Sequence, residues 1–246
     1  MYWFCAIANN QYGTSFGAVV TFTTPAAVPS VSTGAANPIM ATGATLNATA
    51  NPNGGSTAAW FRYSATSPGS CNDTFGTRVP AVMGGSDIGY SNTYQPFSQP
   101  ITDLAQGTTY YFCAIAANSA GTSVGGLGSF TTLTSPTVTT NPATSISNLS
   151  AQLNASANPN GDSAIGWFRL GTTNPVTCDD TFGNRVPTVG SVSLGNAITP
   201  QSYNQPASGL TPNTTYWVCA VAQNSLGKSF GLPVSFTTFD KPAVTT

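Results

Sequence analysis

Histidine and glutamate are absent from this chain, and only 5% of its 246 residues carry a charge. Without histidine, the Ser-His-Asp and Cys-His arrangements of nucleophilic catalysis are excluded, and the most common metal ligand is missing. The acidic residues, all aspartates, are too sparse to supply the carboxylate pair of a glycosidase. We therefore expect a protein that is not an enzyme and that holds no cofactor and no metal.

A strong net charge and long apolar runs are missing as well. The formal net charge is −1, so no long-range field would attract nucleic acid or an anionic membrane. No segment approaches the roughly 18 apolar residues of a membrane-spanning helix. Thr, Val, Tyr and Phe are instead frequent, and Gly, Pro and Asn punctuate the chain every few residues, which predicts an all-β protein.

One sequence motif occurs three times, as YWFCAIANN at 2–10, YYFCAIAAN at 110–118 and YWVCAVAQN at 216–224. Each copy leads through a Gly-rich turn to a Phe-Thr-Thr strand. Other parts of the unit repeat once, such as CNDTFGTRVP at 71–80 and CDDTFGNRVP at 178–187. The spacing of about 107 residues is the length of one β-sandwich domain.

These repeats predict the domain organisation. We expect complete sandwiches at 25–133 and 134–239. Residues 1–24 match only the last two strands of a unit, which predicts the end of a preceding repeat. Residues 240–246 match the first strand, which predicts the start of a following one.

Several motifs of the repeat point to a known family. They are an Asn-Pro-Asn-Gly turn before an aromatic strand and a Leu-x-x-x-Thr-Thr-Tyr sequence that leads into a Tyr-x-Phe-x-Ala-x-Ala-x-Asn strand. A Phe-Thr-Thr strand closes the unit. Over nearly the whole chain, the units resemble the fibronectin type III-like repeats of large bacterial surface and secreted proteins. The resemblance implies tandem immunoglobulin-like β-sandwiches and leaves the function open, because such sandwiches have many roles. A cysteine pair and a long insertion around residues 65–92 depart from the family pattern.

The cysteines predict one disulfide in each complete unit, Cys71–Cys113 and Cys178–Cys219. Each would join the insertion to the Tyr-x-Phe strand and close a loop of about 40 residues, worth roughly 3–4 kcal/mol in the chain-entropy model. Disulfides of this kind indicate an oxidising compartment. Cys5 is left over; either its partner lies in the missing half of the first unit or it links two chains.

Because side chains alternate along a strand, the repeated strands have an inner and an outer face. Tyr110, Phe112, Ala114 and Ala116 are expected to face the core, with Tyr110 as a tyrosine-corner residue together with Tyr2 and Tyr216. The outer face is then unusually apolar. Either the insertion folds back over it, or it docks a neighbouring subunit or a ligand. The candidate contact residues on this face are Trp60, Arg62, Tyr111, Ile115, Trp167, Arg169 and Trp217.

Six of the thirteen charged residues recur at equivalent positions, as Arg62 with Arg169, Asp73 with Asp180 and Arg78 with Arg185. We expect each aspartate to pair with the arginine five residues on or with the outward arginine of the tryptophan strand, and that outward arginine also has the chemistry to stack on an aromatic ring. Calcium binding at Asp73 or at Asp179 and Asp180 is a weaker alternative, because calcium needs six to eight oxygens.

Two of the Asn-x-Ser/Thr sequons occupy equivalent positions and point away from the core. Asn47 and Asn154 are therefore candidate glycosylation sites.

These observations favour a structural segment of an extracellular fibre, sheath or surface stalk, in which neighbouring repeats or copies of the chain are the partners. The alternative is an adhesin, or a carbohydrate-binding or spacer module, in which the tryptophans stack on glycans. The two differ in whether the insertion covers those tryptophans.

Overall fold

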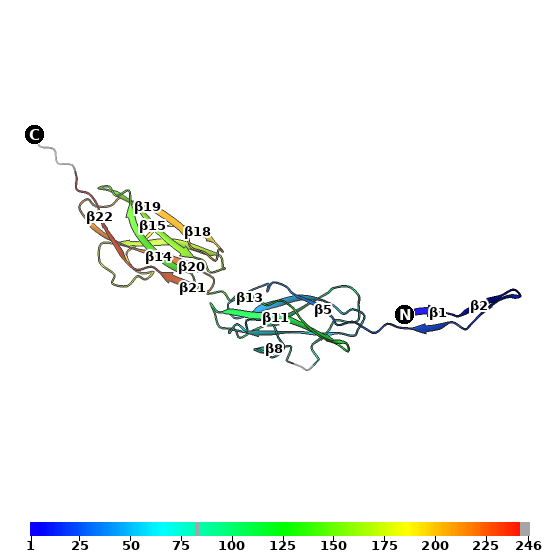
Figure 1. Cartoon of the computed structure of the whole chain (residues 1–246). Coiled ribbons are helices and arrows are strands. Elements are labelled where there is room, and N and C mark those ends of the chain that lie inside the picture. The colour runs from blue at the N-terminus through cyan, green and yellow to red at the C-terminus, as the bar shows by residue number, and fades with distance from the viewer. Residues whose placement is uncertain (82–83, 242–246) are drawn as a thin grey trace, which may run out of the picture. The chain divides into compact units, whose positions relative to one another are not determined.

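The computed structural model describes residues 1–81 and 84–241 (Figure 1). Two compact units divide the chain: unit 1 contains residues 1–39, 43–103 and 109–131, and unit 2 contains 40–42, 104–108 and the residues from 132 onward. The described residues form strands throughout, and none of them belongs to a helix that could cross a bilayer. The expected domain limits stay a prediction, and residues 242–246 of the expected following strand lie outside the described residues.

Unit 1 is a sandwich of two antiparallel sheets. One sheet has the strand order β10-β6-β5, and the other has the order β12-β11-β7-β8, with β13 pairing β11 and β9 pairing β7. The strands are β5 (Ser30–Thr33), β6 (Ala44–Asn51), β7 (Ala58–Ser64), β8 (Thr77–Val79), β9 (Ser86–Asp87), β10 (Gln95–Ile101), β11 (Thr109–Asn118), β12 (Gly121–Val124) and β13 (Gly128–Thr131).

Unit 2 repeats this topology strand for strand. Its sheets have the orders β14-β15-β19 and β17-β16-β20-β21, with β18 pairing β16 and β22 pairing β20. The strands are β14 (Thr137–Thr144), β15 (Ser150–Asn158), β16 (Ala164–Gly171), β17 (Asn184–Val186), β18 (Val192–Gly195), β19 (Gln201–Ser208), β20 (Thr215–Asn224), β21 (Gly227–Phe230) and β22 (Val234–Thr237). The predicted fold class, tandem immunoglobulin-like sandwiches, is confirmed.

The core lies between the two sheets and follows the alternation of the sequence. In β15, Ala151, Leu153, Ala155 and Ala157 are buried, while the residues between them are partly exposed. Small alanines on this sheet leave room for Phe168 and other large side chains of the facing sheet. The expected inner face of β11 is also buried at Phe112, Ala114 and Ala116.

Local side-chain hydrogen bonds fix the turns at two of the strand ends. In unit 1, the Asn51 side chain accepts a hydrogen bond from the Asn53 backbone at 3.0 Å, and Asn53 has a positive φ of 50°, a conformation that asparagine tolerates. In unit 2, the Tyr216 hydroxyl accepts a hydrogen bond from the Thr211 backbone at 2.9 Å. This bond to a residue five positions upstream is the expected tyrosine corner.

Residues 1–24, the N-terminal segment, form a ribbon of two strand pairs. β1 (Tyr2–Phe4) pairs with β4 (Val20–Phe22), and β2 (Ile7–Asn10) pairs with β3 (Gly13–Phe16). No other described strand joins either pair. Every residue of these four strands is exposed, which distinguishes this segment from the two sandwiches.

Candidate functional site

The outer face of the larger sheet carries the most distinctive chemistry of the chain. In both units a disulfide joins the middle of the sheet to the segment that follows the tryptophan strand. Cys71 bonds Cys113 with their Cα atoms 6.0 Å apart, and Cys178 bonds Cys219 with their Cα atoms 5.7 Å apart. Because Cys113 and Cys219 are fully buried, each disulfide holds the inserted segment against the outer face.

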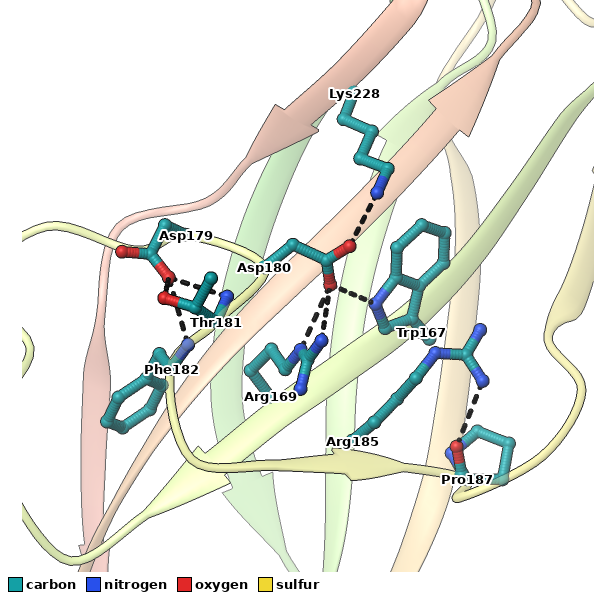
Figure 2. Close-up of polar contacts among 9 residues, drawn as sticks. All are labelled: Trp167, Arg169, Asp179, Asp180, Thr181, Phe182, Arg185, Pro187 and Lys228. Carbon is teal, nitrogen blue, oxygen red and sulfur yellow. Dashed lines mark hydrogen bonds and ion pairs between the residues drawn. The ribbon is translucent and has the colours of Figure 1, made fainter.

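In unit 2, the Asp180 carboxylate accepts hydrogen bonds from three side chains (Figure 2). Its Oδ1 atom accepts hydrogen bonds from Trp167 Nε1 at 3.1 Å and from Arg169 Nε at 3.0 Å, while its Oδ2 atom accepts one from Lys228 Nζ at 2.6 Å. Burial alone would raise the pKa of Asp180, but the bonds from Lys228, Arg169 and Trp167 outweigh it and hold the pKa below its ordinary value. The carboxylate is therefore a fixed negative charge.

A cation stacks over the Trp167 indole ring. The Arg185 guanidinium carbon lies 4.8 Å from the ring centroid, and Arg185 Nη1 donates to the Pro187 carbonyl at 3.2 Å (Figure 2). The tryptophan ring is thus held between the inserted strand and the rest of the sheet.

Unit 1 contains the same cluster with one donor fewer. Asp73 Oδ1 accepts from Trp60 Nε1 at 2.8 Å and from Arg62 Nε at 3.0 Å, and the Arg78 guanidinium carbon lies 4.2 Å from the Trp60 ring centroid. Thr122 occupies the position of Lys228. Of the two expected pairings, the aspartate adopts the one with the arginine of the tryptophan strand. The arginine that stacks over Trp60 is Arg78, while Arg62 pairs with Asp73.

The Thr-Phe-Gly turn after each aspartate has a geometric reason. Gly76 and Gly183 have positive φ values of 52° and 49°, and a Cβ atom there would lie 2.1 Å from the Tyr63 carbonyl oxygen or 2.2 Å from that of Leu170. Only glycine lets the inserted segment pass this close to the strand. Before the turn in unit 2, Asp179 accepts bonds from the Thr181 hydroxyl and from the backbones of Thr181 and Phe182. The Thr181 hydroxyl bond is the main cause that lowers the pKa of Asp179.

Comparisons with known proteins found solved structures with a distant likeness to this chain. No family model and no curated protein matches the sequence. The FN1–FN3 domains of chicken CNTN1 align over 97% of this chain and 75% of their own, with 17% identity and a TM-score of 0.33. A sensor domain of the anti-sigma factor RsgI4 from Pseudobacteroides cellulosolvens aligns over 44% of this chain and 94% of its own, with 19% identity and a TM-score of 0.29. With TM-scores this low, the strand order is what assigns the fold.

The fold is fibronectin type III-like. On this scaffold, the expected contact face is mostly closed. Trp60 and Trp167 are only 6% and 3% exposed, and Ile115 is fully buried. Of the two alternatives for this face, these three residues follow the one in which the inserted segment folds back over it, held there by the disulfide and the aspartate. Arg62 and Arg169 are committed to their aspartates, and Tyr111 and Trp217 are half-buried.

The side-chain amides of the two candidate glycosylation sites make hydrogen bonds within the sandwiches. A glycan is attached to the asparagine side-chain nitrogen. In Asn47 this nitrogen donates to the carbonyls of Ala35 and Asn37 at 3.0 and 3.1 Å, and in Asn154 it donates to the Pro142 carbonyl at 3.0 Å. Both asparagines lie in the central strand of a sheet and are half-buried. Their amides hold the segment after β5 in unit 1 and strand β14 in unit 2, so a glycan on either nitrogen would replace these bonds.

The remaining chemistry is sparse. Within the described residues, no three His, Cys, Asp or Glu side chains gather where they could hold a metal ion. A groove in unit 2 is lined by Phe182, Arg185, Pro206 and Tyr216, among others. Arg185 carries the charge in that lining, and it already stacks on Trp167. The arrangement of the outer face therefore serves to fasten the insertion.

Sequence reasoning missed Lys228. Its carboxylate partner is a repeated residue, but the lysine itself has no counterpart in unit 1, so the repeat could not draw attention to it. Its place on β21, which pairs with β20, brings it beside Asp180.

Proposed function

We propose that this chain is a structural segment of an extracellular fibre, sheath or surface stalk built from tandem sandwiches. The observation that carries the proposal is the closed outer face. In each unit a disulfide, an Asp–Arg ion pair and a cation over the tryptophan hold the insertion in place. The chain thus uses its rare charges and its cysteines for rigidity.

The low charge supports the same function. With 5% charged residues and a net charge of −1, repeats can pack side by side with little repulsion. Disulfides persist in oxidising surroundings, which agrees with a place outside the cell. A carbohydrate-binding or adhesive role would need an open aromatic strip, and Trp60 and Trp167 are buried.

Electron microscopy of the material that contains this protein tests the proposal. We expect filaments or lattices with an axial repeat of one or two sandwich lengths, roughly 35–40 Å each for domains of this size. The matched control is the same material after disulfide reduction, in which the order should decrease. Dispersed particles without lateral order before reduction would contradict a fibre or sheath.

A further inference from the structure

The N-terminal segment has the strand pairing of β11, β12 and β13 in unit 1, but no second sheet covers its aromatic rings. Phe4 and Phe22 are 55% and 52% exposed, whereas their counterparts Phe112 and Phe130 are 1% and 5% exposed. The rings nevertheless have the arrangement found in the cores. Tyr2 stacks on Phe22 with centroids 5.3 Å apart, and Tyr110 stacks on Phe130 at 5.8 Å.

Its backbone also matches that of the complete units. Gly17 N donates to the Ala6 carbonyl at 2.8 Å, as Gly125 N does to the Ala114 carbonyl at 2.8 Å. The Asn10 side chain accepts a bond from the Tyr12 backbone at 2.8 Å, which is the local bond that Asn118 makes with Ala120. The segment therefore already has the conformation that a complete sandwich requires.

In unit 1, β11 contacts the rest of its sandwich through β7 along one edge, and through Thr33 and the segments beside β5 and β6. Residues 111–117 pair with β7, and Ala114 N donates to the Thr33 hydroxyl at 3.1 Å. The Asn118 amide nitrogen donates to the carbonyls of Ala27 and Pro52 at 2.8 and 3.1 Å. These contacts come from strands β5 to β7 and the turns beside them.

The corresponding groups of the N-terminal segment are the edge of residues 3–9 that faces away from β3 and β4, the Ala6 N–H and the Asn10 amide. No described strand pairs with that edge. Cys5 is an exposed free thiol at the position of Cys113 and Cys219, both of which are disulfide-bonded. The strand edge, the ring face and the thiol thus lack the same missing half of a sandwich.

We propose that residues 1–24 bind a half-sandwich of this chain's own repeat type, with strands equivalent to β5–β10. Its tryptophan strand pairs with residues 3–9, its core side chains cover Tyr2, Phe4 and Phe22, and its cysteine equivalent to Cys71 bonds Cys5. Oxidised glutathione accepts the two electrons of the two thiols, so that one protein disulfide and two molecules of reduced glutathione result. This inference rests on the fold and is independent of the proposed fibre.

The test adds a synthetic polypeptide of residues 25–103 to the intact chain in a glutathione redox buffer. The expected result is a 1:1 adduct joined between Cys5 and the peptide's Cys71, identified by peptide mapping, with at least about tenfold slower amide hydrogen exchange in residues 2–10. The matched control is the same peptide with Phe61→Asp, which keeps the thiol but cannot pack in the core. We expect it to give at least about tenfold less adduct, because an unpaired charge in a core is strongly unfavourable.

A second variant separates packing from thiol chemistry. With Cys5→Ser in the chain, the unmodified peptide should still slow exchange in residues 2–10, although no adduct forms. Equal adduct yields for the two peptides, a Cys5–Cys5 dimer in place of the adduct, or unchanged exchange in residues 2–10 would each overturn the proposal. Electron microscopy of the fibre is unaffected by any of these outcomes, so the two proposals fail separately.

Discussion

Units 1 and 2 bury equivalent tryptophans beneath equivalent insertions, but the insertions are held by different numbers of contacts. Asp180 has Lys228 as a third donor, while Asp73 has two donors and Thr122 at the lysine's position. Both tryptophans are nevertheless almost completely buried. The disulfide, the aspartate and the two arginines are therefore sufficient to close the face over the tryptophan, and the lysine is an addition.

The cores differ by a compensating pair of residues. Where unit 1 has Ala59 and Phe97, unit 2 has Gly166 and Tyr203. The Tyr203 hydroxyl donates to the Val221 carbonyl at 2.9 Å, and a Cβ atom on Gly166 would lie 2.8 Å from the tyrosine ring. Burial raises the pKa of Tyr203, so the hydroxyl remains a donor. Gly166 leaves room for the Tyr203 ring, and the hydrogen bond from the tyrosine hydroxyl holds that ring in place.

The largest expected effect concerns the disulfides, which the two units share. Replacing Cys71 and Cys113 by alanine should destabilise unit 1 by about 3–4 kcal/mol, and the same change at Cys178 and Cys219 should cost unit 2 as much. The loops have nearly equal lengths, with sequence separations of 42 and 41. Amide hydrogen exchange of β11 and β20 measures the two losses separately. Clearly unequal losses would show that one insertion is held by other contacts.

A smaller effect is expected where the cores differ. Gly166→Ala should destabilise unit 2 by about 1–3 kcal/mol, because the added methyl group overpacks against Tyr203. Adding Tyr203→Phe frees the ring from the Val221 carbonyl, so the cost of the alanine should shrink. Chemical denaturation of the single and double variants gives this coupling. The reverse change in unit 1, Ala59→Gly, serves as control and should cost only about 0.5–1 kcal/mol. Strict additivity in unit 2 would contradict the compensation.

The smallest effect belongs to the ion pair that unit 1 lacks. Lys228→Thr should cost unit 2 about 0–1 kcal/mol and less at high salt, because the lysine side chain is 41% exposed. Thr122→Lys, the reciprocal change, should stabilise unit 1 by a similar amount if the geometry carries over. Denaturation of both variants at low and high salt measures this. A salt-independent loss at Lys228 would point to packing of its aliphatic stem instead.

The stability of unit 2 should also depend on pH through Asp180. Because its pKa in the folded protein lies below the ordinary value of 3.8, its contribution is complete above that pH. As the pH falls further, the unfolded chain takes up the proton first and stability decreases, until the folded carboxyl is protonated as well. Asp180→Asn should weaken this acid dependence in unit 2, which exchange rates in β20 as a function of pH would show.

Much of the fold could be predicted from residues that recur. The repeated motif around Cys113 predicted a strand, the inner face of that strand and a disulfide-bonded cysteine. The structure contains both expected disulfides. The pairing of Asp73 with Arg62 was one of two options that sequence left open. Lys228 was missed because it occurs once, and the role of the Asn47 amide was missed because its carbonyl partners lie ten or more residues away.

The sequence by itself determined the period of the repeat, the alternation that separates core from outer face, and the cysteines available to each unit. These follow from local geometry, since side chains of a strand point alternately to its two sides. Only the tertiary structure decided that the outer tryptophans are covered and that the N-terminal rings are exposed. Whether a face is buried depends on which distant segment returns to it, and local alternation carries no information about that segment.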